Sequence, residues 1–108
     1  MAGTRRRQIR HERRLTVTSE ALALWRKLRE IDEEGSDEEL EPAGRRREYL
    51  DADRALMLSL GLSIGDFSPV SVRHEEVPDT IIHNPLAVEK WRKAWAWRVA
   101  LIGADRAC

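Results

Sequence analysis

The first stretch of helical periodicity follows residue 18. Its apolar positions share one face at helical spacing: Ala21, Leu24, Trp25, Leu28 and Ile31. This spacing predicts a helix over about 19–32, with Thr18 or Ser19 as its N-terminal cap. Seven acidic residues and no basic one lie in 32–41, where they would oppose the negative end of that helix. We therefore expect the helix to end there and an exposed linker to follow.

A second periodic stretch precedes Gly61. Its apolar face is formed by Tyr49, Ala52, Leu56, Met57 and Leu60. The pattern predicts a helix over about 45–60, and Gly61 is suited to a left-handed stop. Residues 62–82 contain two prolines and short β-branched patches, but too little alternation to predict strands. We expect an ordered connection that packs on the helices through Ile64, Phe67 and Val70.

The third stretch begins with a strong helix start, the capping residue Asn84 followed by Pro85. It predicts a helix over about 85–102 and a frayed tail at 104–108. Its apolar positions form two groups on different sides of the helix: Val88, Trp91, Trp95, Val99 and Ile102 on one, and Ala94, Trp97 and Leu101 on the other. This arc is wider than one core-facing stripe requires.

Two interpretations of the wide arc remain open. The helix is either central and covered by the other two helices, or it packs against a neighbouring subunit with part of its surface. Tryptophan is enriched in protein interfaces, which favours the second interpretation. The expected interface residues are Val88, Trp91, Trp95, Trp97 and Leu101. The predicted fold class is all-α, with three main helices and a long ordered connection before the last, assembling as a homo-oligomer.

Composition and charge add a basic arm to this picture. The 108 residues suit one domain, expected over 17–103, and the 19 basic and 19 acidic residues balance overall. Residues 1–16 form the predicted flexible arm, with Glu12 against six arginines: Arg5, Arg6, Arg7, Arg10, Arg13 and Arg14. Such an arm is drawn to the phosphates of double-stranded DNA without reading sequence. Alternatively, it is a solubilising tail or docks on the acidic segment.

Other features restrict the location and the chemistry. A single cysteine, Cys108, and the lack of a membrane-length apolar run or secretion signal predict a cytoplasmic protein without membrane contact. "GLSIG" (61–65) contains the glycine-serine-glycine spacing of hydrolases, but no strand is predicted before it. His11, His74 and His83 are scattered and lack zinc-ligand spacing. We expect no enzymatic activity, no cofactor and no metal site.

Three segments together resemble phage small terminase subunits, the DNA-packaging proteins of phages, prophages and gene transfer agents. "TSEALALWRKLRE" (18–30) is similar to the first helix of many members of that family. "LDADRALMLSLG" (50–61) lies where the family has an acidic, leucine-bearing second helix. "VPDTIIHNPLAVEKWRKAWAWRVALIGAD" (77–105) is similar to the asparagine-proline-leucine start and the basic, apolar final helix.

The resemblance implies a non-enzymatic adaptor in a bacterial host cell. Family members form rings, bind DNA and deliver it to the large terminase subunit, which holds the ATPase and nuclease. Asn84, Pro85 and Leu86 would then begin the assembly helix. No convincing helix-turn-helix is predicted, so the arginine arm would supply most of the DNA affinity, with low sequence specificity. The alternative function is a small regulatory or inhibitory protein that binds a protein partner.

Overall fold

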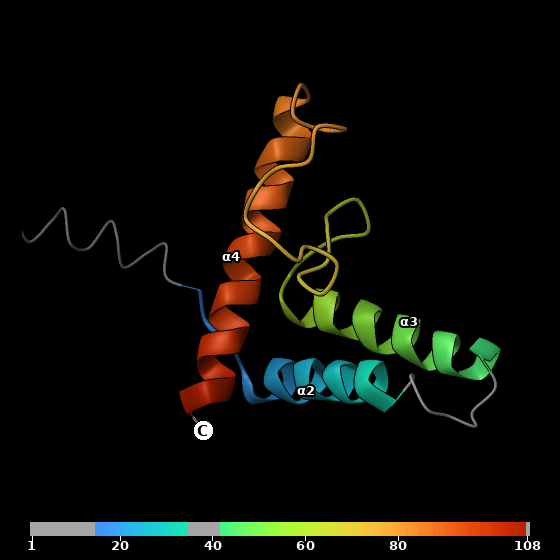
Figure 1. Ribbon diagram of the computed structural model, residues 1–108. Coiled ribbons are helices and arrows are strands. Elements are labelled where there is room, and N and C mark those ends of the chain that lie inside the picture. Colours follow the sequence, from blue (N-terminus) through green and yellow to red (C-terminus); the bar gives the residue numbers. More distant parts are fainter. Residues whose placement is uncertain (1–14, 35–41, 108) are drawn as a thin grey trace, which may run out of the picture.

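The computed structural model describes residues 15–34 and 42–107, which contain three helices and no strand. Helix α2 spans Ser19–Glu34, α3 spans Pro42–Ser59 and α4 spans Pro85–Ala107. The prediction of an all-α chain with three main helices is confirmed for this part of the chain. In Figure 1, α2 and α3 lie side by side, and α4 crosses them steeply at one end of the pair. The connection between α3 and α4 returns along the half of α4 that extends beyond the other helices.

Local sequence accounts for the helix boundaries. The side-chain oxygen of Thr18 accepts a hydrogen bond from Ala21 N at 3.1 Å, and that of Asn84 accepts one from Ala87 N at 3.2 Å. Both contacts satisfy backbone donors that lack a partner within the first helical turn. Gly61 follows α3 with a φ of 79°, a conformation that side chains with a Cβ rarely adopt. These three predicted signals are confirmed.

Two hydrophobic clusters stabilise the fold. The larger one joins all three helices to the connection through Ala21, Trp25, Leu28, Ala52, Leu56, Val70 and Leu101. The smaller one lies along α4, where Val72 of the connection packs on Trp91 and Ala94. The connection is therefore an integral part of the core, because it covers a face of α4 that neither α2 nor α3 reaches.

The connection is built of turns, and one of its three predicted packing residues is not buried. Phe67 and Val70 pack against the clusters, as expected. Ile64, in contrast, is 93% exposed. It lies in a turn in which Asp66 accepts hydrogen bonds from the backbone and hydroxyl of Ser63. These hydrogen bonds hold residues 63–66 in a local polar turn. Ile64 lies within this turn and does not reach either cluster.

Helix α4 is longer than predicted. It passes Gly103 and ends at Ala107, so 104–107 is helical, whereas a frayed tail was expected. The reason is a contact distant in sequence: Asp105 binds Arg26 and Arg29 of α2, each at 2.7 Å. This double ion pair holds the last turn of α4 against α2.

Three of the five predicted interface residues of α4 are buried within the chain. Trp91, Trp97 and Leu101 are only 9%, 8% and 0% exposed. Leu101 packs in the larger cluster with α2, and Trp91 packs in the smaller cluster with Val72 of the connection, so in this conformation these side chains offer little surface to a neighbour. The wide apolar arc is thus filled mainly from inside the chain, because the 25-residue connection contributes packing that the helical pattern alone does not reveal.

A pair of leucines on α4 tests this core. Replacing Leu101, which is fully buried, by Ala should lower the free energy of unfolding by about 2–5 kcal/mol, because it leaves a cavity. The same change at Leu86, which is 61% exposed, should cost less than about 0.5 kcal/mol. Urea denaturation at several protein concentrations measures both. A Leu101 effect that grows with concentration would instead place this side chain between subunits.

Candidate functional site

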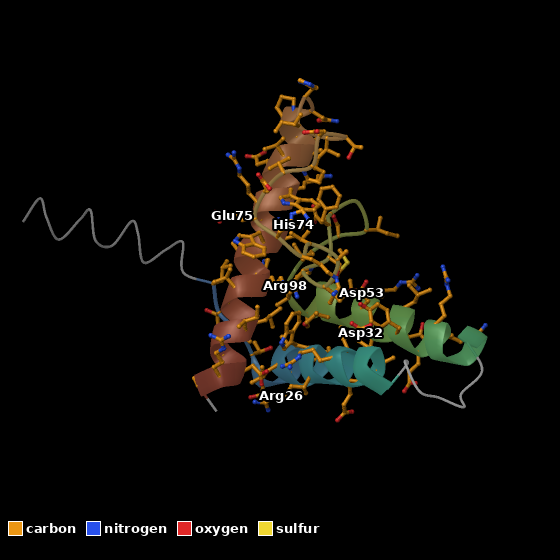
Figure 2. The ribbon with its side chains drawn as sticks, in the orientation of Figure 1. Arg26, Asp32, Asp53, His74, Glu75 and Arg98 are labelled. Carbon is orange, nitrogen blue, oxygen red and sulfur yellow. The ribbon has the colours of Figure 1, made fainter. Side chains whose placement is uncertain are left out.

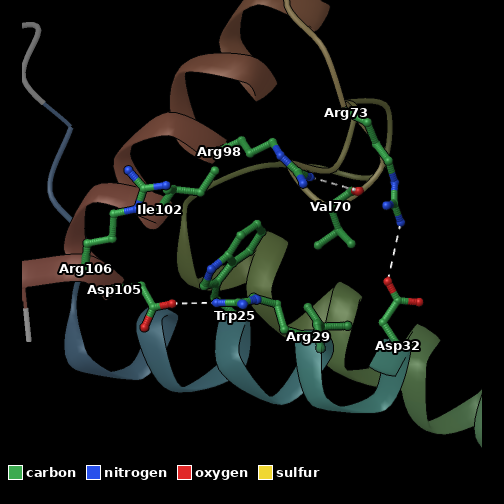
Figure 3. Close-up of a pocket in the computed structure, with 10 residues that line it drawn as sticks. Trp25, Arg29, Asp32, Val70, Arg73, Arg98, Ile102, Asp105 and Arg106 are labelled. Carbon is green, nitrogen blue, oxygen red and sulfur yellow. Dashed lines mark hydrogen bonds and ion pairs between the residues drawn. The ribbon is translucent and has the colours of Figure 1, made fainter. Parts of the chain in front are cut away.

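A cleft of about 570 Å³ lies where α2, the connection and α4 meet. Figure 3 shows it in close-up, with side chains from all three segments around it. It is lined by Trp25, Leu28, Arg29, Asp32, Val70, Arg73, Arg98, Ile102, Asp105 and Arg106, and we call it the arginine cleft. Four guanidinium groups face two carboxylates over an apolar floor. Its lining is therefore net positive, although the whole chain is neutral.

Arg98 of α4 links the three walls of the arginine cleft. One terminal nitrogen of Arg98 donates hydrogen bonds to the carbonyls of Pro69 at 3.0 Å and Val70 at 3.3 Å. Its guanidinium carbon lies 5.4 Å from the centre of the Trp25 ring, within the range of a cation–π interaction. Burial lowers the pKa of Arg98 below its ordinary value, and the charge of Arg73 lowers it further. Arg98 is thus a partly desolvated cation with no carboxylate bound to it in the described part of the chain.

The two carboxylates of the cleft differ in how firmly they are held. Asp105 is 19% exposed and binds Arg26 and Arg29 at 2.7 Å each. Hydrogen bonding from Arg26 lowers the pKa of Asp105, partial burial opposes this, and the charges of both arginines add to the lowering. Asp32 instead faces Arg73 at 3.5 Å, and both of these side chains are more than half exposed. Such an exposed, long pair contributes little to stability and exchanges readily.

The indole of Trp25 contributes an unusual polar atom beneath Arg98. Its Nε1 is buried, and no hydrogen-bond partner for it is present in the described part of the chain. An unsatisfied buried donor costs about 1–3 kcal/mol. The ring therefore occupies this position because of its packing in the larger cluster, and its N–H provides a sensitive local probe of the cleft.

A second hollow, of about 940 Å³, lies beside the other half of α4. Trp95 and Ile82 line it together with the acidic side chains Glu75, Glu76 and Asp79. Figure 2 shows His74 and Glu75 against this part of α4, well separated from Asp32 and Arg26. The carbonyl of His74 accepts a hydrogen bond from Trp91 Nε1 at 3.2 Å, so the connection is pinned here.

The predicted site residues fall into three groups. The six arm arginines, Arg5, Arg6, Arg7, Arg10, Arg13 and Arg14, lie outside the described residues. Trp91, Trp97 and Leu101 are buried in the protomer, as described above. Val88 and Trp95 are half-buried and retain accessible area.

Residues on α4 continue the surface that begins with Val88 and Trp95. Val88, Trp95 and Ile102 follow one another at intervals of seven residues, and Val99 lies four residues after Trp95. This spacing places them on one side of the helix. Val99 is 50% exposed and the other three are half-buried, so we call these four residues the α4 stripe.

Sequence reasoning did not predict the arginine cleft, because its residues come from three segments far apart in the chain. One signal was available: Arg98 interrupts the apolar side of its predicted helix. A charge at such a position must find a partner or a cavity when the helix packs. The identity of the other walls required the tertiary structure.

Comparisons with protein-family models, curated proteins and solved structures find no match to this chain. Among residues 15–34 and 42–107, no three His, Cys, Asp or Glu side chains are grouped in a way that could hold a metal ion. The described helices also include none with the length and apolar character needed to cross a bilayer.

The ion pairs of Asp105 predict a specific dependence on pH. Because its folded-state pKa is lowered from 3.8, its stabilising effect is fully present above that value and is lost as pH falls through the lowered pKa. Asp105→Asn should therefore reduce stability at pH 7, and the difference from the unmodified protein should shrink below pH 3.8. Urea denaturation across this range measures the difference. Amide exchange in 103–107 should also accelerate at pH 7.

The exposed Asp79 provides the matched control. Asp79→Asn removes the same charge without breaking a described ion pair. An equal, pH-independent loss in both variants would contradict a specific role for Asp105.

Proposed function

We propose that this protein is a non-enzymatic DNA-packaging adaptor resembling a small terminase subunit. It binds double-stranded DNA through its basic arm, self-associates through α4 and serves a large terminase subunit in the cytoplasm of a bacterial host. The observation that carries this proposal is the α4 stripe, which stays partly exposed although Ile102 and Trp95 also pack against the two clusters of the protomer. The basic arm and the resemblance in three segments support the choice of DNA as the ligand.

The kind of assembly is suggested by two exposed apolar side chains outside α4, which we call the second surface. Leu58 near the end of α3 is 68% exposed, and Ile64 in the following turn is 93% exposed. These two residues lie on different elements from the α4 stripe. A contact between two different surfaces of the same protein is heterologous, and it builds a closed ring when the rotation between subunits closes. We infer that the stripe of one subunit packs on Leu58 and Ile64 of the next.

Size considerations agree with a ring rather than an isolated pair. Stable protein interfaces bury about 1,200–2,000 Å² in total. A stripe of four side chains over four helical turns supplies a modest part of such an area. Closure into a ring gives each subunit two contacts, so contacts that are weak one by one together stabilise the assembly.

Charge insertion tests this assembly. Val99→Glu in the α4 stripe and Ile64→Glu in the second surface should each convert the assembly to smaller species, because both place a charge in an apolar contact. Ala96→Glu introduces the same charge on α4 at an exposed position outside the stripe and should leave the assembly intact. Light scattering and native mass spectrometry measure the mass, and circular dichroism checks the helix content. A monomeric unmodified protein would contradict the self-association proposal.

Mixing the two variants distinguishes the kinds of contact. The Val99→Glu subunit keeps its second surface, and the Ile64→Glu subunit keeps its stripe. A heterologous contact then predicts a one-to-one dimer that grows no further. If the stripe packed on itself, the Ile64→Glu protein would still assemble alone.

The basic arm makes a separate prediction about DNA. The logarithm of the binding constant should fall steeply with the logarithm of salt concentration, by about 0.9 per phosphate contacted. Deleting residues 1–14 removes six arginines and should lower this slope by up to about 5. Fluorescence anisotropy with a random-sequence duplex measures it. An unchanged slope after deletion would show that the arm does not contact the phosphates.

The alternative function, a regulatory protein that binds a protein partner, is supported by the hollow around Trp95. This hollow combines an indole and Ile82 with three acidic side chains and one basic one, Arg92, and its excess of negative charge suits a basic, apolar peptide. A monomer without DNA affinity would favour this alternative.

A further inference from the structure

We propose that the arginine cleft is a phosphate-binding site. One part of this inference rests on the proposed function: the phosphate belongs to the backbone of the DNA that the arm also binds. Guanidinium groups bind phosphate oxygens through paired N–H donors in a planar fork, which makes arginine the preferred residue for this ligand. The cleft gathers four such groups from three segments, and two of them carry the argument: the half-buried Arg98 and the exposed Arg73.

Arg98 is oriented by its surroundings before any ligand arrives. Its two described hydrogen bonds come from a single nitrogen, Nη1, and fix the guanidinium against the carbonyls of Pro69 and Val70. The ring of Trp25 fixes one face of the same group. The Nε and Nη2 donors make no hydrogen bond within the described part of the chain. A phosphate that binds here does not have to immobilise the Arg98 side chain, because the fold has already ordered it.

The carboxylates of the cleft leave room for an anion. Asp105 is engaged by two guanidiniums, one of which, Arg26, lies outside the cleft lining. Its negative charge is therefore balanced locally. Asp32 opposes the ligand, but its pair with Arg73 is long and exposed, and a phosphate can replace it. Arg106 adds a further cation, with no described ion pair, at the end of α4.

The position of the cleft agrees with a DNA backbone as the source of the phosphate. Val17, next to the point where the described chain begins, packs on the same cluster as Leu101 and Ile102. The chain that carries the arm thus enters the body beside the helical turn that lines the cleft. Trp25 is only 3% exposed and Arg98 lies over its ring, so no aromatic face in this cleft is left to stack on a base. This favours a backbone phosphate over a free nucleotide.

The decisive experiment measures the salt dependence of duplex DNA binding by the full chain. The double variant Arg73→Gln, Arg106→Gln removes two rim charges and leaves Arg98 to hold the fold. The slope of log binding constant against log salt should fall by about 1, because about 0.9 is expected for the one phosphate contact that the cleft loses. The matched control, Arg46→Gln with Arg47→Gln, removes two exposed charges from α3 and should leave the slope within about 0.5. Equal slopes in the two variants would overturn the proposal for DNA.

A variant of opposite sign strengthens the test. Asp32→Asn releases Arg73 from its ion pair and removes a charge that repels phosphate. It should bind DNA more tightly, by roughly 2- to 10-fold at low salt, as expected when a nearby like charge worth about 1 kcal/mol is removed. Weaker binding by this variant would contradict the cleft as an anion site.

A second readout separates failure of the cleft from failure of the proposed function. Titration with inorganic phosphate at constant ionic strength should shift the indole N–H signal of Trp25 in an NMR spectrum, assigned with Trp25→Phe. The shift should vanish in Arg73→Gln, Arg106→Gln and persist in the α3 control. If the unmodified protein binds no DNA but shows this shift, the proposed function fails and the cleft remains a site for free phosphate. If the cleft variants change neither the salt dependence of DNA binding nor the phosphate-induced shift of Trp25, the cleft is not a phosphate-binding site.

Discussion

The contact between Arg98 and Trp25 is the interaction on which the arrangement of this small protein most depends. It joins α4 to α2 through the indole ring and to the connection through the carbonyls of Pro69 and Val70. Helix α4 crosses the other two helices near one end only, where Leu101 in the larger cluster and the ion pairs of Asp105 also hold it. A half-buried cation in this position must be compensated, and the carbonyls and the ring provide that compensation. The same geometry leaves part of the guanidinium directed to a cleft, which links the stability of the fold to its proposed ligand.

The connection between α3 and α4 decides how the tryptophans of α4 are used. Val72 and Phe67 pack on Trp91, whose ring meets that of Phe67 edge to face at a centroid distance of 5.5 Å. Ser68 anchors this segment to α3 through Asp53 and also accepts a hydrogen bond from Val70 N. A segment without regular structure can thus replace a fourth helix, because its polar backbone is satisfied by turns and by buried side chains. What remains of the wide apolar arc is the α4 stripe.

The two proposed surfaces suit the two tasks of the proposed packaging adaptor, which are contact between subunits and binding of DNA. Apolar side chains of the α4 stripe suit permanent contacts between subunits, because the free energy gained by burying them grows with the apolar area removed from water. The arginines of the cleft and the arm suit a polyanion that must be held and then moved, because such contacts weaken as counterions compete. The two surfaces meet at Ile102 of α4, which belongs to the stripe and also lines the cleft, so assembly would place the cleft of each subunit at a repeated position around a ring.

The sequence by itself determined the three helices, their caps at Thr18 and Asn84, and the left-handed stop at Gly61. These features depend on neighbours a few residues apart, so local pattern and side-chain chemistry were sufficient. The tertiary structure alone decided the end of α4, where Asp105 meets arginines nearly eighty residues earlier in the chain. It also decided which tryptophans are buried and brought Arg73 and Arg98 to one cleft with Trp25. Such contacts depend on how the helices cross and on the path of the connection, and no periodicity within a single segment encodes either.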